Sequence, residues 1–105
     1  MSDPRFVPRN YATIPSHFGK STTIHWVRPK SRMQEERLVA AQIQHVFAFR
    51  VWNRLKFLDR TISDYAKAID VSYDRTAKVL RGVTIMRLED IAAAEIELGE
   101  IFSSR

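Results

Sequence analysis

Three features of the sequence predict an all-α domain. Glycine and proline are sparse, at 3 and 4 of 105 residues, and every proline lies before residue 30. This composition disfavours a turn-rich sheet architecture. Residues 33–58 contain neither glycine nor proline, and three shorter segments with helix-capping residues follow them. Because 45% of the residues are hydrophobic, the chain can bury one modest core, and we expect a bundle of about five helices.

Residues 1–32 are predicted to form an N-terminal arm ahead of a helical domain over residues 33–105. Residues 22–27 are β-branched and aromatic, and residues 11–14 form a weaker strand candidate. Segments this short can pair as one small hairpin at most, or they can lie extended on the helices. The prediction is therefore an extended or short-hairpin arm.

Residues 33–58 are predicted to form one long helix with apolar side chains around most of its circumference. A small domain buries only one side of its first helix, so the remaining apolar surface needs a cover. We expect this cover to be either the N-terminal segment, with Tyr11, Trp26 and Val27, or a second copy of the chain.

The shorter helices are predicted from their capping residues. Thr61 and Asp64 have the spacing of a capping box. Ser72 is suited to cap the next helix, and Gly82 to end it in the left-handed conformation. Thr84 is expected to cap a last helix that runs to Leu98 and buries a stripe of Leu88, Ile91, Ala94 and Leu98. Ile96 lies nearly opposite this stripe, which indicates a dimer contact.

Residues 63–82 are predicted to form two short helices joined by a tight turn. Small and apolar residues fall where the helices must touch, namely Ala66, Ile69, Val71, Thr76, Val79 and Leu80. The outer face of the second helix is polar and mostly cationic, with Tyr73, Asp74, Arg75, Lys78 and Arg81. A helix with such a face can lie in the major groove of DNA and contact base edges.

This arrangement resembles the lambda-repressor-like helix-turn-helix family, the class of phage repressors and their bacterial relatives. The resemblance covers about residues 46–102 and is carried by Ala66, Val71, Thr76, and Val79 with Leu80. The family usually has glycine in the turn where this chain has Asp70. That position commonly needs a positive φ, which Asp adopts at a small cost.

The resemblance implies a small, repressor-like transcriptional regulator that binds double-stranded DNA sequence-specifically, with a recognition helix over about residues 73–80. Arg75 and Lys78 would contact guanine, and Tyr73 would contact a thymine methyl group or a phosphate. Asp74 would accept a hydrogen bond from cytosine, hold Arg75 in position, or act as a favourable charge in the first helical turn.

Further DNA contacts are implied at the ends of the two short helices. Thr61 and Ser63 would contact phosphate together with backbone N–H groups. Ser72, at the start of the recognition helix, and Arg81, at its end, complete the expected DNA-binding set on this part of the chain.

Positive charge is concentrated in the N-terminal half. The net charge is +5, with eleven Lys/Arg against four Asp/Glu in residues 1–60 (+7) and six against eight in residues 61–105 (−2). Arg28, Lys30 and Arg32 form a compact cationic run before the long helix. This run is either a basic arm that contacts DNA phosphates or the minor groove, or a solvated linker.

Several classes of function are not supported. Cysteine is absent, the three histidines lack metal-ligand spacing, and three glycines form no phosphate loop. We therefore expect no enzyme activity, no metal site and no cofactor. The N-terminus lacks a long apolar run, so we expect no signal peptide and no membrane span, and hence a soluble cytoplasmic protein.

Two alternative functions remain open at this point. The same helices can serve as a protein–protein adaptor or antitoxin-type module that docks its apolar long helix onto a partner. The basic arm can instead drive low-specificity architectural DNA binding. A homodimer would use the long helix over residues 33–58, the N-terminal segment or the Ile96 face.

Overall fold

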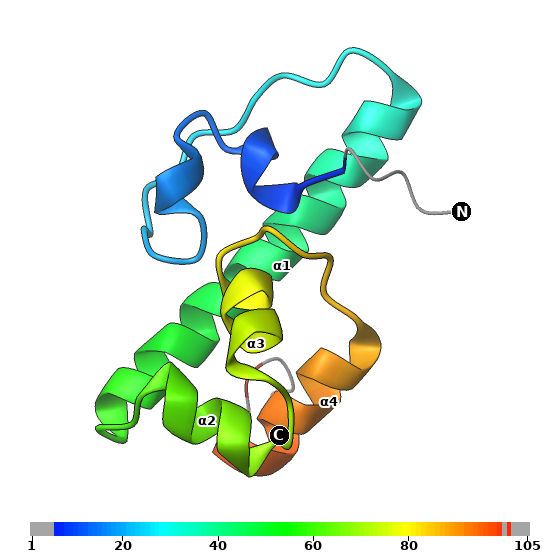
Figure 1. Ribbon diagram of the computed structural model, residues 1–105. Coiled ribbons are helices and arrows are strands. Elements are labelled where there is room, and N and C mark those ends of the chain that lie inside the picture. Colours follow the sequence, from blue (N-terminus) through cyan, green and yellow to red (C-terminus); the bar gives the residue numbers. More distant parts are fainter. Residues whose placement is uncertain (1–5, 100, 102–105) are drawn as a thin grey trace.

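The computed structural model describes residues 6–99 and residue 101, which form four α-helices behind a folded N-terminal segment (Figure 1). The α-helices are α1 (Arg32–Phe57), α2 (Ile62–Ala68), α3 (Tyr73–Leu80) and α4 (Leu88–Leu98). Two short 3-10 turns, η1 (Pro8–Tyr11) and η2 (Pro15–His17), precede them. The all-α prediction is confirmed, and the described residues contain four α-helices where about five were expected.

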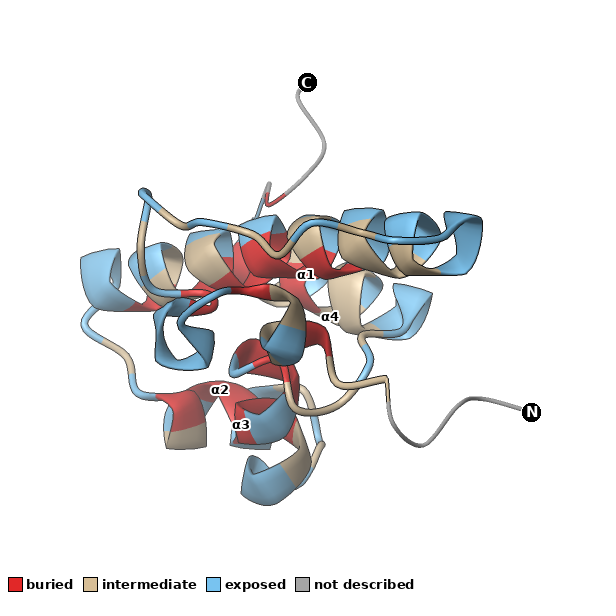
Figure 2. Ribbon diagram, turned by 90° about the horizontal axis from the view of Figure 1, so that it is seen from above, coloured by how far each residue is buried: buried red, intermediate tan, exposed pale blue. Residues whose placement is uncertain are grey.

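The long helix is confirmed to within a residue at each end. Ser31 caps α1, because its hydroxyl oxygen accepts a hydrogen bond from the backbone N–H of Gln34. The middle of α1 is buried on the side that faces the other elements, whereas both of its ends are exposed (Figure 2). α1 is therefore the support on which the N-terminal segment, α3 and α4 all pack.

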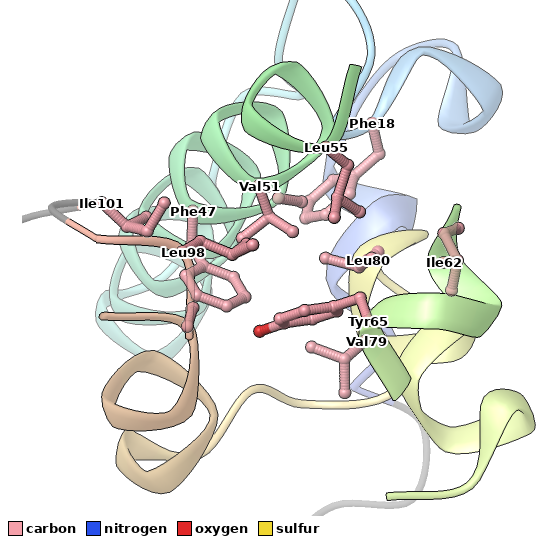
Figure 3. Close-up of a cluster of buried hydrophobic side chains, with 12 residues drawn as sticks. Phe18, Phe47, Val51, Leu55, Ile62, Tyr65, Val79, Leu80, Leu98 and Ile101 are labelled. Carbon is pink, nitrogen blue, oxygen red and sulfur yellow. The ribbon is translucent and has the colours of Figure 1, made fainter. Parts of the chain in front are cut away.

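One hydrophobic core joins the helices to the N-terminal segment. Phe47, Val51 and Leu55 of α1 point towards Tyr65 of α2 and Leu80 of α3 (Figure 3). The remaining buried members of this core are Phe18, Ala48, Ile62, Val79, Ala94, Leu98 and Ile101. Phe18, from the N-terminal segment, thus shares one core with the four helices.

The N-terminal segment is wedged against α1 and α3. Phe18 is 1% exposed, and its ring covers Gly82 so closely that a Cβ there would lie 2.6 Å from it. A Cβ on Gly19 would lie 2.8 Å from the Leu80 carbonyl oxygen and 2.9 Å from the Ala48 Cβ. The segment is therefore held by close packing on two helices at once.

Backbone pairing in the N-terminal segment is limited to one antiparallel bridge, between Ala12 and Trp26. The described residues contain no longer strand, so the expected hairpin is reduced to this single contact. Trp26 also packs against the core, so the N-terminal segment covers part of α1, whereas Val39, Ile43 and Val46 on its other side stay exposed.

The start of α4 differs from the prediction. Thr84 does not cap a helix, because α4 begins at Leu88 after an extended stretch. The buried Gln44 holds this stretch to α1: its amide nitrogen donates to the Thr84 carbonyl at 2.8 Å, and its amide oxygen accepts from the Met86 N–H at 2.9 Å. The late start places Leu88 outside the core, and it is 81% exposed rather than buried.

The predicted end of α4 and the remaining residues of its inner stripe are confirmed, and the dimer contact at Ile96 stays a prediction. Ala94 and Leu98 are buried and Ile91 packs against the core, whereas Ile96 is 86% exposed. Among the described residues, no helix combines the length and the apolar character that crossing a membrane requires.

His45 links α1 to the N-terminal segment. Its Nδ1 atom accepts a hydrogen bond from the Gly19 N–H at 2.8 Å, and its ring packs edge-on against Phe18 and Trp26. Burial lowers the pKa of His45 from its ordinary value of 6.5, although a hydrogen bond with the Ser21 backbone opposes this shift. The imidazole is therefore held neutral, with Nδ1 free to accept.

Gly19→Ala should destabilise the fold much more than Gly99→Ala. Both glycines have a positive φ, but a Cβ at Gly99 meets no atom within 4 Å, whereas one at Gly19 collides with backbone and side chain. Gly99→Ala should cost about 1–3 kcal/mol from its backbone conformation alone. Gly19→Ala should cost about 1–3 kcal/mol more because of overpacking. Urea denaturation of both variants measures the difference in unfolding free energy. Equal decreases in the two variants would contradict the close packing of the N-terminal segment at Gly19.

The stability of the protein should fall as the pH drops below about 6.5, because the unfolded state then binds a proton that the buried His45 resists. His45→Gln retains an acceptor for the Gly19 N–H but does not titrate in this range. The unfolding free energy of the variant should therefore depend less on pH between about 7.5 and 5. If the unfolding free energies of the wild type and the variant change with pH by the same amount, His45 is not the titrating group.

Candidate nucleic-acid interface

α2 and α3 are joined by a tight turn that follows the sequence prediction. Thr61 and Asp64 form the capping box at the start of α2. In the turn, Asp70 has a φ of 59°, and the Val71 N–H donates to the Ala66 carbonyl at 3.0 Å. The expected positive φ at Asp70 is thus present, in the left-handed region that Asp and Asn enter more readily than most other residues.

α3 has a buried and an exposed face, as its sequence predicts, except that Arg75 is only partly exposed. Its buried residues are Thr76, Ala77, Val79 and Leu80. Ser72 caps it by accepting a hydrogen bond from the Arg75 N–H at 3.1 Å. Tyr73, Asp74, Lys78 and Arg81 are exposed, so they form an outer face directed away from the core.

On this outer face, Asp74 pairs with Lys78 at 3.0 Å. Both side chains are largely exposed, so the pair contributes little to stability and separates at little cost. Asp74 therefore does not hold Arg75 in position, which was one of the roles considered for it. Its place in the first turn of α3 agrees with a favourable helix-terminal charge.

The Arg75 side chain, predicted to contact guanine, is bound to Asp90 of α4 and is 27% exposed. Its Nη1 and Nη2 atoms donate to the two carboxylate oxygens of Asp90 at 2.7 and 3.0 Å. Burial of Asp90 favours its neutral form, but the bonds from Arg75 and from the Arg87 N–H outweigh this effect and lower the Asp90 pKa. This two-pronged ion pair fastens α3 to α4, so Arg75 is a structural residue.

The start of α2 is less open to phosphate than expected. The Thr61 N–H donates to the Asp64 carboxylate at 2.9 Å, and the Thr61 hydroxyl accepts from the Asp64 N–H at 3.0 Å. The bond from the Thr61 backbone lowers the pKa of Asp64, and it occupies a backbone N–H that the predicted phosphate contact requires. Ser63 remains available, since it lines a surface hollow together with Tyr73.

The run of Arg28, Lys30 and Arg32 lies at the other end of α1 from α2 (Figure 1). All three residues are exposed, and Arg32 pairs with Glu36 one turn further along α1. Because a helix rises 1.5 Å per residue, Arg32 is about 36 Å along α1 from Lys56, which adjoins α2. The structure does not bring this run together with the start of α2.

Two lysines outside the DNA-binding set of the sequence analysis lie near the ends of α3, Lys56 with its first residue and Lys20 with the residue that follows its last. Lys56 of α1 lines the same hollow as Ser63 and Tyr73. Lys20, from the turn after η2, lies over the Trp52 ring at 5.8 Å from its centroid. Lys20 and Lys56 line a common neighbouring hollow. No sequence signal joins residues so far apart, because only the folding of the N-terminal segment places Lys20 there.

Comparison with protein-family models, curated proteins and solved structures found no match to this chain.

Arg75→Ala should destabilise the protein by about 1–3 kcal/mol, because it removes two charge-assisted hydrogen bonds from a largely buried carboxylate. In the Arg75→Ala background, Asp90→Asn should cause little further decrease in the unfolding free energy. A double-mutant cycle should therefore give a coupling energy between the two residues of about the same size as the loss from Arg75→Ala. Lys78→Ala, on the same helix but in an exposed pair, should cost under about 0.5 kcal/mol. Additive losses at Arg75 and Asp90 in urea denaturation would contradict the structural role.

Proposed function

We propose that this chain binds double-stranded DNA sequence-specifically, as a small cytoplasmic transcriptional regulator of the helix-turn-helix type with α3 in the major groove. The observation that carries the proposal is the division of α3. One face is buried in the core, and the other presents Tyr73, Asp74, Lys78 and Arg81 without a covering element. A rigidly supported helix with an open polar face is suited to contact base edges.

The base-contacting set differs from the one expected from sequence. Since Arg75 is bound to Asp90, Lys78 becomes the main candidate for the acceptor atoms of guanine. Asp74 is one turn away and can accept from the amino group of cytosine. On binding, the exposed Asp74–Lys78 ion pair would separate, and the two side chains would hydrogen-bond to a neighbouring cytosine and guanine. The Tyr73 ring would contact a thymine methyl group.

A second candidate function is supported by exposed apolar residues on the back of α1. Val39, Ile43 and Val46 are spaced as one helical stripe, and each is exposed. Phe57, near the end of α1, is 81% exposed. This surface favours docking of a protein partner, or of a second copy of the chain. Because the stripe lies on the side of α1 away from its buried contacts with α3, such docking is compatible with DNA binding.

Selection of bound sites from random duplex DNA tests the proposed function. The wild type should enrich a defined motif, and Lys78→Ala should lower the ratio of affinities for the selected and a scrambled duplex about tenfold or more. Tyr73→Ala should lower the same ratio. Lys30→Ala serves as the control, since it removes the same charge at the far end of α1 and should leave the ratio unchanged.

Failure to enrich any motif would exclude sequence-specific binding. Equal losses on both duplexes from Lys78→Ala would show that α3 does not contact bases. Complete absence of duplex binding, together with capture of a protein by the Val39–Ile43–Val46 stripe, would favour the docking function.

A further inference from the structure

Three surface hollows follow one another beside α3. The first is lined by Ser63, Tyr73, Trp52 and Lys56, among others. The second is lined by Trp52, Lys56 and Lys20. Because neighbouring hollows share Trp52 and Lys56, they form one continuous surface.

The third hollow continues this surface to the other end of α3. It shares Lys20 with the second hollow and adds Arg9 and Arg81. Tyr73 is the first residue of α3 and Arg81 follows its last, so the surface reaches both ends of the helix. We call the four cations Arg9, Lys20, Lys56 and Arg81 the basic strip.

Among the residues that the structure describes, no acidic side chain lines the basic strip. The linings of the three hollows include no Asp or Glu from this part of the chain. Within the part of the chain that the structure describes, none of the four cations forms an ion pair. Arg60 also lines the first hollow but donates to Glu97 at 3.0 Å, so it is not counted in the strip. The strip is a surface of uncompensated positive charge.

The strip is also fixed in place by the fold. Its Lys20 follows the wedge formed by Phe18 and Gly19, and the Gly19 N–H is bound to His45. The Arg9 N–H donates to the Gly82 carbonyl at 2.9 Å, which ties η1 to the residue after Arg81. Cations held on a rigid backbone lose less conformational freedom on binding than cations on a mobile arm.

We propose that the basic strip binds the phosphate backbone of the duplex whose major groove receives α3. This inference rests on the proposed function, because α3 selects the sequence and the strip holds the adjacent strand. Phosphate contacts position a protein on DNA, whereas base contacts supply specificity. Cations on a continuous surface that reaches both ends of a groove-binding helix fit this task, and they differ from the expectation that residues 28–32 provide the backbone contacts.

Fluorescence anisotropy with the selected and scrambled duplexes, between about 50 and 200 mM salt, tests the strip. Lys20→Gln and Lys56→Gln should each weaken binding to both duplexes about three- to tenfold and reduce the slope of log affinity against log salt by about 0.9. The ratio of the two affinities should stay as in the wild type. Lys30→Gln, the matched control, should change either affinity by less than about twofold and should keep the slope.

The outcomes separate this inference from the function on which it rests. If the wild type binds and Lys78→Ala lowers discrimination, but Lys20→Gln and Lys56→Gln behave as the wild type, the strip is wrong and the function stands. The strip is also wrong if Lys30→Gln weakens binding as much as Lys56→Gln does. If the wild type binds no duplex even at about 50 mM salt, both proposals fail. Thermal unfolding of each variant confirms that the substitutions leave the fold intact.

Discussion

Gly19 lies where the N-terminal segment, α1 and α3 come closest together. Its φ of +74° and its contacts with Ala48 and the Leu80 carbonyl leave no room for a side chain. This close approach puts the Phe18 ring over Gly82 and the Gly19 N–H on His45. Much of the molecule depends on this packing, because it closes the core from the N-terminal side and sets the position of α3 on α1.

Polar contacts complete the frame around α3. Gln44 holds α3 and the segment after it to α1 through three backbone groups, those of Val79 in α3 and of Thr84 and Met86 beyond it. Arg75 holds α3 to α4 through Asp90. Gln44 and Arg75 thus make their hydrogen bonds within the protein. The side chains proposed to contact DNA are those that make no such internal bond, or that form an ion pair only at the surface, as Lys78 does with Asp74.

Much of the local structure could be predicted because its causes lie within a few residues. The Thr61–Asp64 capping box, the Ser72 cap, the left-handed Asp70 and Gly82, and the two faces of α3 all follow from local hydrogen bonding and helical spacing. The start of α4 could not be predicted in this way. The Thr84 hydroxyl is of the kind that caps helices. However, the side chain of Gln44, 40 residues earlier, donates a hydrogen bond to the Thr84 carbonyl and holds this stretch outside the helix.

The candidate site shows the same division. By itself the sequence determined that α3 carries a polar outer face and that the N-terminal half carries the excess positive charge, since both are properties of composition and spacing. Only the tertiary structure decided which cations share a surface. It directed Arg75 inwards to Asp90, left residues 28–32 at the far end of α1, and brought Lys20 beside Lys56. The physical reason is that such neighbours are set by packing between distant segments, which no local pattern encodes.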